Sequence, residues 1–276
     1  MLKIIWHRYF TNGIPEYLAR HYWWAYLSKV GVWFFDHHMM INAILFGQYD
    51  NLTNATIRQL KQAPVGEMLQ ISCVYGGLTP ALVQQLPHHQ FHLMDVAPIQ
   101  LALTRQKLLA HATLNQQHVE LAIMNAERMA YTNNSFDTVL IFFLLHELPG
   151  NARKNVITES LRILRPNGRL LICEYGEFSQ SHFLHHWWPL RFVLGVLEPF
   201  LPNFWHEKLK TVVNDGATTI NRHVASEKIN RIFSGFYRVV EYQIENNPSQ
   251  SSQQIDASRR SGPRTTDTAI TTGMAK

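Results

Sequence analysis

The chain has 276 residues, of which 46% are hydrophobic, 12% aromatic and only 16% charged, and its formal net charge is +5. This length suits one large domain or a domain with an added subdomain. Lysine and arginine do not form the dense clusters typical of nucleic-acid binders, so that class is excluded. A basic, aromatic-rich surface is better suited to anionic lipid headgroups.

Residues 1–62 are predicted to form a helical, aromatic-rich cap. Aromatic clusters occupy residues 22–26 and 32–35, and an apolar run follows at 39–46. Arg20, Lys29, Asp36 and Asp50 bound and separate these runs, so no uncharged apolar run reaches the ~20 residues that a membrane span needs. We also expect no secretory signal. Tryptophan and tyrosine prefer membrane interfaces, which favours contact with a lipid surface or a lipid substrate. The alternative is that these rings simply pack on the main domain.

Residues 63–245 alternate between apolar strands and helices, which predicts an α/β domain with a parallel, Rossmann-like sheet and right-handed crossovers. The expected strands are 68–74, 91–95, 121–125, 136–145 and 169–175, and the expected helices between them are 80–86, 99–110 and 153–164.

The first predicted strand ends in a turn that contains Gly76-Gly77, and a helix follows at once. A strand, a tight turn and a helix N-terminus form the usual cradle for a ligand at the carboxyl edge of a parallel sheet. A buried strand and turn that bind nothing are an open alternative.

The next two strands end in polar residues. Asp95 lies at about the spacing from the first turn at which dinucleotide-binding folds place an acid that accepts hydrogen bonds from a ribose diol. Asp95 could instead cap the following helix. The third strand runs into Asn125, whose side-chain amide offers an acceptor at the same edge.

The middle of the chain carries a more specific combination. Ser-Phe-Asp at residues 135–137 precedes an apolar strand that ends in His146-Glu147, and after a helix the chain reads Leu-Arg-Pro-Asn-Gly-Arg-Leu at 164–170. Over about residues 65–175 this pattern resembles class I S-adenosylmethionine-dependent methyltransferases, especially those acting on quinones. The resemblance implies a Rossmann-like class I methyltransferase sheet, here with a helical N-terminal cap and an apolar insertion.

The first motif departs from the usual pattern of such proteins, which reads acidic-x-Gly-x-Gly-x-Gly. Here Gln70, Ser72 and Val74 stand at the positions of the acid and the first two glycines, and only Gly76 remains. We hypothesise that these three replacements change how the methionine moiety is held, so that its amino group rather than its methyl group faces the substrate.

A closer resemblance is to the rhodoquinone-biosynthesis RquA family, in which a glycine-poor first motif is typical. It rests on the segments 70–76, 95–101 and 142–147 and on the aromatic N-terminal region with Asn-Ala-Ile-Leu-Phe-Gly at 42–47, and it covers about the first 245 residues. Membership implies conversion of ubiquinone to rhodoquinone, in which an amino group replaces a ring methoxy group. The resemblance also implies S-adenosylmethionine as the amino donor and manganese, Mn²⁺, as the metal.

The residues predicted to bind S-adenosylmethionine lie at the ends of the first three strands. They are Gln70, Ser72, Val74, Tyr75, Gly76, Asp95, Val96, Asn125 and Ala126.

The residues predicted to act as base or metal contacts end neighbouring strands at the carboxyl edge, where ligands bind in such folds. They are His146, Glu147, Glu174 and Tyr175. A metal could polarise a quinone carbonyl as a Lewis acid, and manganese favours carboxylate, imidazole and water ligands. Each of these residues could instead be a helix cap or a hydrogen-bonded rim residue, and the metal ligands are left open.

Residues 178–210 are predicted to form an apolar insertion, either a lid or a shallow membrane-inserted helix pair, with a helical cap on the core as the alternative. Within this insertion, His182, His185 and His186 are expected in a solvated or interfacial loop.

The last part of the chain is predicted to contain a helix at 220–233 and a closing strand at 236–244. Residues 246–276 are rich in Asn, Ser, Gln, Thr and Pro, which cannot bury enough apolar surface to fold, so we expect a disordered tail.

Cys73 and Cys173 each fall inside a predicted strand, which favours buried reduced thiols and supports neither a disulfide nor a cysteine metal site. We expect a cytoplasmic protein that associates peripherally with the inner face of the membrane, where ubiquinone is its partner; no protein partner follows from the sequence. Two alternatives stay open. One is an ordinary methyltransferase acting on a quinone or lipid, and the other is a non-catalytic protein that binds quinone or lipid and scaffolds partners.

Overall fold

The computed structural model describes residues 13–110, 119–179 and 182–247. Its centre is a seven-stranded sheet with the order β3-β2-β1-β4-β5-β7-β6. The strands are β1 (Glu67–Ile71), β2 (Gln90–Asp95), β3 (Val119–Ile123), β4 (Phe136–Phe142), β5 (Leu164–Tyr175), β6 (Arg222–Ile232) and β7 (Tyr237–Asn246). The first five strands pair in parallel, and β7 runs antiparallel to both β5 and β6. The predicted Rossmann-like sheet is thereby confirmed.

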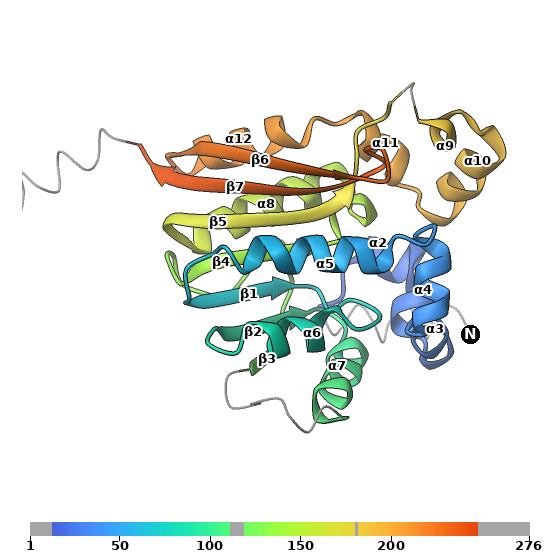
Figure 1. Ribbon diagram of the computed structural model, residues 1–276, viewed down its shortest axis with the longest axis horizontal. Helices are drawn as coiled ribbons and strands as arrows, with labels where there is room; N and C mark the ends of the chain where they lie inside the picture. Colours follow the sequence, from blue (N-terminus) through green and yellow to red (C-terminus); the bar gives the residue numbers. More distant parts are fainter. Residues whose placement is uncertain (1–12, 111–118, 180–181, 248–276) are drawn as a thin grey trace, which may run out of the picture.

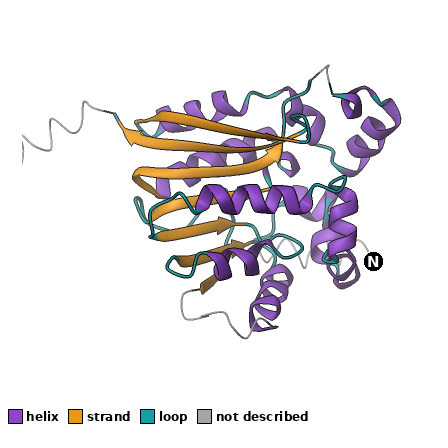
Figure 2. Cartoon of the chain, viewed as in Figure 1, coloured by secondary structure: helices purple, strands orange, loops and turns teal. Residues whose placement is uncertain are grey.

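Helices cover the sheet on both faces and crowd one end of it (Figure 1). They are α2 (Glu16–His21), the π-helix η1 (Trp23–Leu27), α3 (Lys29–Phe35), α4 (His38–Ile44), α5 (Tyr49–Leu60), α6 (Leu78–Gln85), α7 (Pro98–Ala110), the 3₁₀ helix η3 (Leu145–Glu147), α8 (Gly150–Ile163), α9 (Phe183–His186), α10 (Trp188–Leu197), α11 (Leu201–His206) and α12 (Leu209–Thr219). Figure 2 shows α5 crossing in front of the sheet, with α8 and α12 behind it.

The central strands explain why a parallel sheet forms. β4 and the apolar half of β5 are almost continuously apolar because both of their faces are covered, as parallel strands usually are. In register, Leu69 of β1 lies beside Val139 of β4, and Val139 lies beside Leu170 of β5; all three are fully buried. This core fixes the carboxyl ends of β1, β2, β4 and β5 at one edge of the sheet.

That edge is enclosed by two segments from outside the sheet. Helices α3 and α4 of the N-terminal region and helices α9 and α10 of the insertion lie at the same end of the molecule (Figure 1). Ring contacts connect the two segments, since His21 and Phe200 lie 5.4 Å apart between ring centroids. The described part of the N-terminal region consists of short helices joined by turns.

The segment after α12 is a strand, so the helix predicted at 220–233 is wrong. β6 pairs with β7 along almost its whole length, and the turn between them places Phe233, Ser234 and Gly235 at positive φ. β6 is an edge strand that is partly solvated on both faces, so its sequence lacks the regular two-residue alternation that would have indicated a strand. The predicted closing strand is confirmed by β7.

The histidines of the insertion also differ from expectation. His182 and His185 are buried, whereas His186 is exposed. The rings of His182 and His185 both pack 5.0 Å from Phe236, at the β6–β7 turn, so the segment is a packed cap there rather than a solvated loop. β7 runs to Asn246, and the predicted disordered tail lies, from residue 248 onward, outside the described residues.

Both cysteines are free and buried, as predicted, and burial raises the pKa of each thiol above its ordinary value. Among the helices that the structure describes, none combines the length and the apolar character that crossing a membrane requires.

Arg153 of α8 ties the carboxyl edge to the insertion. Its side chain is fully buried, and it donates hydrogen bonds of 2.9 Å to the carbonyl oxygens of Leu145 and Leu148. It also forms an ion pair with Glu207 and lies 4.8 Å from the ring of Phe204. A single buried guanidinium therefore holds η3 against α11.

We predict that Arg153→Met lowers the free energy of unfolding by about 3 kcal/mol, because Glu207 and two buried carbonyls lose their partner. Arg105→Met, on the exposed side of α7, serves as the control and should change stability by less than about 0.5 kcal/mol. Urea denaturation measures both. Equal stabilities of the two variants would contradict this role for Arg153.

Candidate functional site

The site is built at the carboxyl ends of β1, β2, β4 and β5, where loops place polar side chains beside the apolar core. Two adjoining pockets open there. The first is lined mainly by α2, η1 and the ends of β1, β2 and β3, and the second by η1, α3, α4 and the ends of β1, β4 and β5. Tyr22, Tyr26, Ser72 and Glu147 line both pockets and so form their common wall.

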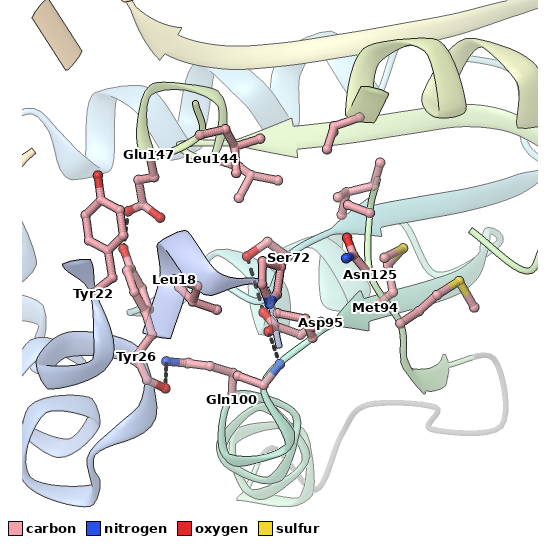
Figure 3. Close-up of a pocket in the computed structure, with 18 of the residues that line it drawn as sticks. Leu18, Tyr22, Tyr26, Ser72, Met94, Asp95, Gln100, Asn125, Leu144 and Glu147 are labelled. Atoms are coloured by element: carbon pink, nitrogen blue, oxygen red, sulfur yellow. Dashed lines mark hydrogen bonds between the residues drawn. The ribbon is translucent and has the colours of Figure 1, made fainter. Parts of the chain in front are cut away.

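Asp95 organises the first pocket from the end of β2 (Figure 3). One carboxylate oxygen accepts a hydrogen bond from the backbone of Ala97 at 2.7 Å, which is the capping contact weighed above. The other accepts from the backbone of Cys73 at 2.8 Å and from the Ser72 hydroxyl at 3.2 Å. Burial raises the pKa of Asp95 to about 6, although these three hydrogen bonds oppose the shift.

Ser72 replaces a glycine of the usual motif but keeps a glycine-like backbone, with φ at 68°. Its carbonyl accepts from the Gln70 side chain at 3.1 Å, and Gln70 in turn accepts from the Thr79 hydroxyl at 3.1 Å. Gln70 is buried and lines neither pocket. It therefore holds the loop to α6 from behind, and its predicted contact with a cofactor would have to pass through Ser72.

Gly76 also lies outside the two pockets. Its backbone N–H donates to Asp36 and its carbonyl accepts from Lys107, each at 2.9 Å. A Cβ at this position would lie 2.5 Å from the Tyr49 hydroxyl, and φ is +78°, so only glycine fits. The N-terminal region thus occupies the turn that the usual motif leaves to a ligand.

The structure divides the other predicted cofactor residues between the two pockets. Ser72, Asp95, Val96, Asn125 and Ala126 line the first pocket, and Ser72, Val74 and Tyr75 line the second. Asn125 uses its side-chain oxygen to accept from the backbone of Glu127 at 2.8 Å.

The first pocket needs a movement before it can hold a nucleoside. Its cavity volume is about 60 Å³, whereas small-molecule sites usually measure roughly 300–1,000 Å³. Tyr17, Leu18 and Tyr22 of the α2–η1 segment line it, and Figure 3 shows Leu18 and Tyr22 beside the other lining side chains. This segment packs through a small separate cluster of Ile14, Ala19, Leu27 and Ala97, and η1 is a π-helix, a form common at functional sites. We therefore expect α2 and η1 to move outward when a nucleoside binds.

Glu174 lies at the end of β5 and holds the neighbouring residues of the site in place. Its side chain is fully buried, and its carboxylate accepts hydrogen bonds from the backbone of Leu145 at 2.6 Å and of Tyr175 at 3.1 Å. The same carboxylate lies 2.9 Å from Nδ1 of His146. Burial lowers the pKa of His146, but the charge and hydrogen bond of Glu174 outweigh this and raise it to about 9.

Glu147 stands between the two pockets. The Tyr26 hydroxyl donates a hydrogen bond to it, and one of its oxygens lies 4.0 Å from Nε2 of His146. Burial, followed by the nearby Glu198 carboxylate, raises the pKa of Glu147 to about 8. A carboxylate with a raised pKa at the junction of two pockets is suited to accept a proton there.

Glu198, at the C-terminal end of α10, was missed by the sequence reading. Burial raises its pKa, and its Oε2 atom is buried without a hydrogen-bond partner in the part of the chain that the structure describes. The sequence did contain a signal, because Glu198 is the only acid in the otherwise apolar stretch 183–202.

His146, Glu147 and Glu198 could hold a divalent metal ion. One ligand atom from each lies within 4.8 Å of the other two. Imidazole and carboxylate donors suit manganese, and the Glu174 contact on Nδ1 is the orienting hydrogen bond that metal-binding histidines usually carry. The unpartnered oxygen of Glu198 offers a ready acceptor. These residues therefore fit the metal that the resemblance implies.

Tyr175, the last residue predicted for this group, lines the second pocket. Its ring packs 4.9 Å from His146 and 5.6 Å from Phe143, and burial raises the pKa of its hydroxyl well above the ordinary value. The second pocket has a cavity volume of about 130 Å³, which is also below the usual range of roughly 300–1,000 Å³, so it too must widen to hold a substrate. It is polar at the Glu147–Glu198 end and apolar toward Ile44, whose side chain is 42% exposed.

Residues 68–168 match the family described as methyltransferase domain. The chain is 31% identical to a demethylmenaquinone methyltransferase of Lactiplantibacillus plantarum over 52% of the chain and 60% of that protein. It is 33% identical to a ubiquinone/menaquinone biosynthesis C-methyltransferase, UbiE, of Hahella chejuensis over 40% of the chain and 43% of that protein. In both comparisons the match covers less than two thirds of the relative's length.

Among solved structures, the mitomycin 7-O-methyltransferase MmcR is similar with a TM-score of 0.52 and 16% identity, over 78% of the chain and 60% of MmcR. At this identity the likeness shows the fold alone. Together with the matched domain and the observed sheet, it establishes the Rossmann-like class I methyltransferase fold.

We predict that Asp95→Asn weakens S-adenosylmethionine binding by at least about tenfold, because a ribose diol donates more strongly to a carboxylate than to an amide. Since burial raises the pKa of Asp95 to about 6, protonation removes the better acceptor, and the wild-type affinity should fall as the pH drops through that value. The Asn variant should lack this step.

Isothermal titration calorimetry on both sides of that pH measures the effect. Asp50→Asn, an exposed acid on α5, is the control and should behave as wild type. Identical pH profiles for wild type and Asp95→Asn would contradict the ribose contact.

Proposed function

We propose that this protein converts ubiquinone to rhodoquinone, replacing a ring methoxy group by an amino group that S-adenosylmethionine donates. The main support for this proposal is that the two pockets share a wall and that Glu147 lines both of them. The first pocket, with Asp95 and Asn125, suits the nucleoside, and the second, apolar on one side and polar on the other, suits a quinone ring. Donor and acceptor would then meet at a buried carboxylate.

The chemistry of the substrate agrees with this arrangement. A fully substituted quinone ring offers no nucleophile to accept a methyl group, but its methoxy-bearing carbon is conjugated to a carbonyl and is electrophilic. S-adenosylmethionine would supply the amine that attacks there and expels methoxide, which leaves as methanol. Elimination across the α- and β-carbons of the methionine moiety would then break its carbon–nitrogen bond and leave the amino group on the ring. Once η1 has moved outward and the hydroxyl of Tyr26 has released the carboxylate of Glu147, this carboxylate would take the proton from that amine. Glu174 would hold His146 in position for the quinone side of the site.

Manganese, when bound, would polarise the quinone carbonyl as a Lewis acid. His146, Glu147 and Glu198 are the residues that would hold it. These three come from η3 and from the end of α10, so the apolar insertion would complete the site.

Relatives named as quinone C-methyltransferases favour a second function, methyl transfer from S-adenosylmethionine to a quinone. The two functions need opposite poses of the same ligand. The replaced glycines support the first, because Ser72 and Val74 alter the loop on which the methionine moiety of a methyltransferase substrate would rest.

The deciding experiment incubates the purified protein with ubiquinone in detergent, Mn²⁺ and S-adenosylmethionine labelled with nitrogen-15 on its amine. We expect mass spectrometry to find a labelled aminoquinone. A methylated quinone together with S-adenosylhomocysteine would contradict the proposal and support the methyltransferase. Absence of S-adenosylmethionine binding at millimolar concentration would leave the non-catalytic scaffold.

The loop hypothesis is tested in the same assay with the variant Ser72→Gly/Val74→Gly. A change in how the amine is presented should lower the yield of aminoquinone by about a hundredfold, while calorimetry still detects bound S-adenosylmethionine. Unchanged amino transfer would show that the two replacements do not set the pose.

For the metal, we predict that Glu198→Gln weakens Mn²⁺ binding by at least about tenfold, because even residues that only orient metal ligands contribute that much. Electron paramagnetic resonance of free Mn²⁺ measures the affinity without any turnover. Glu120→Gln, an exposed acid of β3, is the control. Equal affinities of the two variants would exclude Glu198 as a ligand.

Ubiquinone carries a polyprenyl tail and resides in the bilayer, so we propose that the protein works at the membrane surface. Its assignment to the cytoplasmic face remains a prediction.

A further inference from the structure

The exposed apolar side chains of this protein are concentrated on two segments. Of the 17 large apolar side chains that are exposed in the described part of the chain, 13 belong to residues 23–44 and 183–197. They are Trp23, Val30, Trp33, Phe34, Met39, Ile44, Phe183, Trp187, Trp188, Phe192, Val193, Val196 and Leu197. We call this set the docking surface. So much clustered apolar area on the outside of a protein marks an interaction site.

Helical spacing shows that the docking surface is built rather than incidental. On α10, Trp188, Phe192 and Val196 recur every four residues and are 72%, 66% and 65% exposed, while Leu194 on the opposite side is buried. On α3, Trp33 is 65% exposed while Val32 is buried. An apolar stripe of a helix normally faces the core. Here α3 and α10 each also expose an apolar stripe on the surface of the protein.

The two halves of the docking surface flank the second pocket. Figure 1 places α3, α4 and α10 at the same end of the molecule, beyond the carboxyl edge of the sheet. Ile44 from α4 and Glu198 at the end of α10 both line that pocket. An apolar molecule held at the docking surface would therefore meet the open, apolar side of the pocket.

The charges of the docking surface indicate what it binds. Lys29 and Arg191 are exposed within these two segments, and neither cation belongs to an ion pair among the residues described. The one acid in the same segments, Asp36, is paired with Lys107. Exposed tryptophans beside unpaired cations, without exposed acids, suit the headgroup region of an anionic bilayer.

We propose that the docking surface inserts shallowly into a bilayer that contains anionic lipids. The aromatic rings of α3 and α10 lie at the boundary between headgroups and acyl chains, Lys29 and Arg191 meet lipid phosphates, and the second pocket opens toward the acyl region near Ile44. The proposal rests on the proposed function only for the identity of the substrate that enters there.

The test is flotation of the full chain with vesicles, either of phosphatidylcholine alone or of an equimolar mixture with phosphatidylglycerol. We expect binding to the mixed vesicles that weakens as salt is added. Trp33→Ser/Trp188→Ser should bind at least about tenfold more weakly, because each lost ring is a large buried apolar group. Lys29→Glu/Arg191→Glu should lose at least about fivefold on the mixed vesicles and little on neutral ones.

The matched control is Val65→Ser/Leu109→Ser, which removes two side chains that are 63% and 56% exposed but lie outside the docking surface. It should bind as wild type, and thermal unfolding of all variants checks that they are folded. Failure of the wild type to bind mixed vesicles, or equal losses in the control and the tryptophan variant, would overturn the proposal. A dimer in sedimentation that Trp33→Ser/Trp188→Ser dissolves, without vesicle binding, would assign the surface to a second copy of the chain.

The inference and the proposed reaction can fail independently. Amino transfer to a short-chain quinone in detergent needs the two pockets and no bilayer. Vesicle binding through the docking surface without formation of an aminoquinone would support membrane insertion and contradict the proposed reaction. Formation of an aminoquinone without vesicle binding would support the reaction and contradict membrane insertion.

Discussion

The site depends on one buried carboxylate. Glu174 ends β5 in the fully covered centre of the sheet, where a charge is costly unless every oxygen is bound. The backbone of η3 and the ring of His146 satisfy it. This interaction fixes the orientation of the His146 imidazole. That orientation decides whether His146, Glu147 and Glu198 can bind the same ligand. The strand order, the turn after β4 and the fold of the insertion together place these residues within reach of one another.

The N-terminal region is part of the same construction rather than an added cap. Tyr26 reaches Glu147, Asp36 accepts from Gly76, and Tyr49 accepts from the backbone of Leu78 at the start of α6. The turn that in glycine-rich relatives is free to meet a ligand is here held by protein groups. Ser72, which stands at the position of a motif glycine, donates a hydrogen bond to Asp95, and its backbone keeps a left-handed conformation.

Sequence reasoning predicted the sheet because the apolar strands and turn residues act locally. It also placed His146 and Glu174 near each other, because parallel strands bring their carboxyl ends together, and the structure confirms this proximity. The prediction was wrong or incomplete where contacts between segments far apart in the sequence determine the structure. β6 is an edge strand defined by its neighbour β7, and Glu198 reaches the site only because the fold brings the end of α10 close to His146 and Glu147 of η3. Gln70 and Gly76 occupy positions of the motif, but in the structure they support the loop and line neither pocket.

The proposed reaction requires S-adenosylmethionine to present its amine, not its methyl group, to the quinone pocket. The most direct measurement is an experimental structure of the protein with S-adenosylmethionine, Mn²⁺ and a short-chain ubiquinone. We predict that α2 and η1 have moved outward, that the amine lies within hydrogen-bond distance of Glu147, and that His146, Glu147 and Glu198 hold the metal. A sulfonium methyl group directed at the quinone, with the amine held away from Glu147, would contradict the proposed reaction.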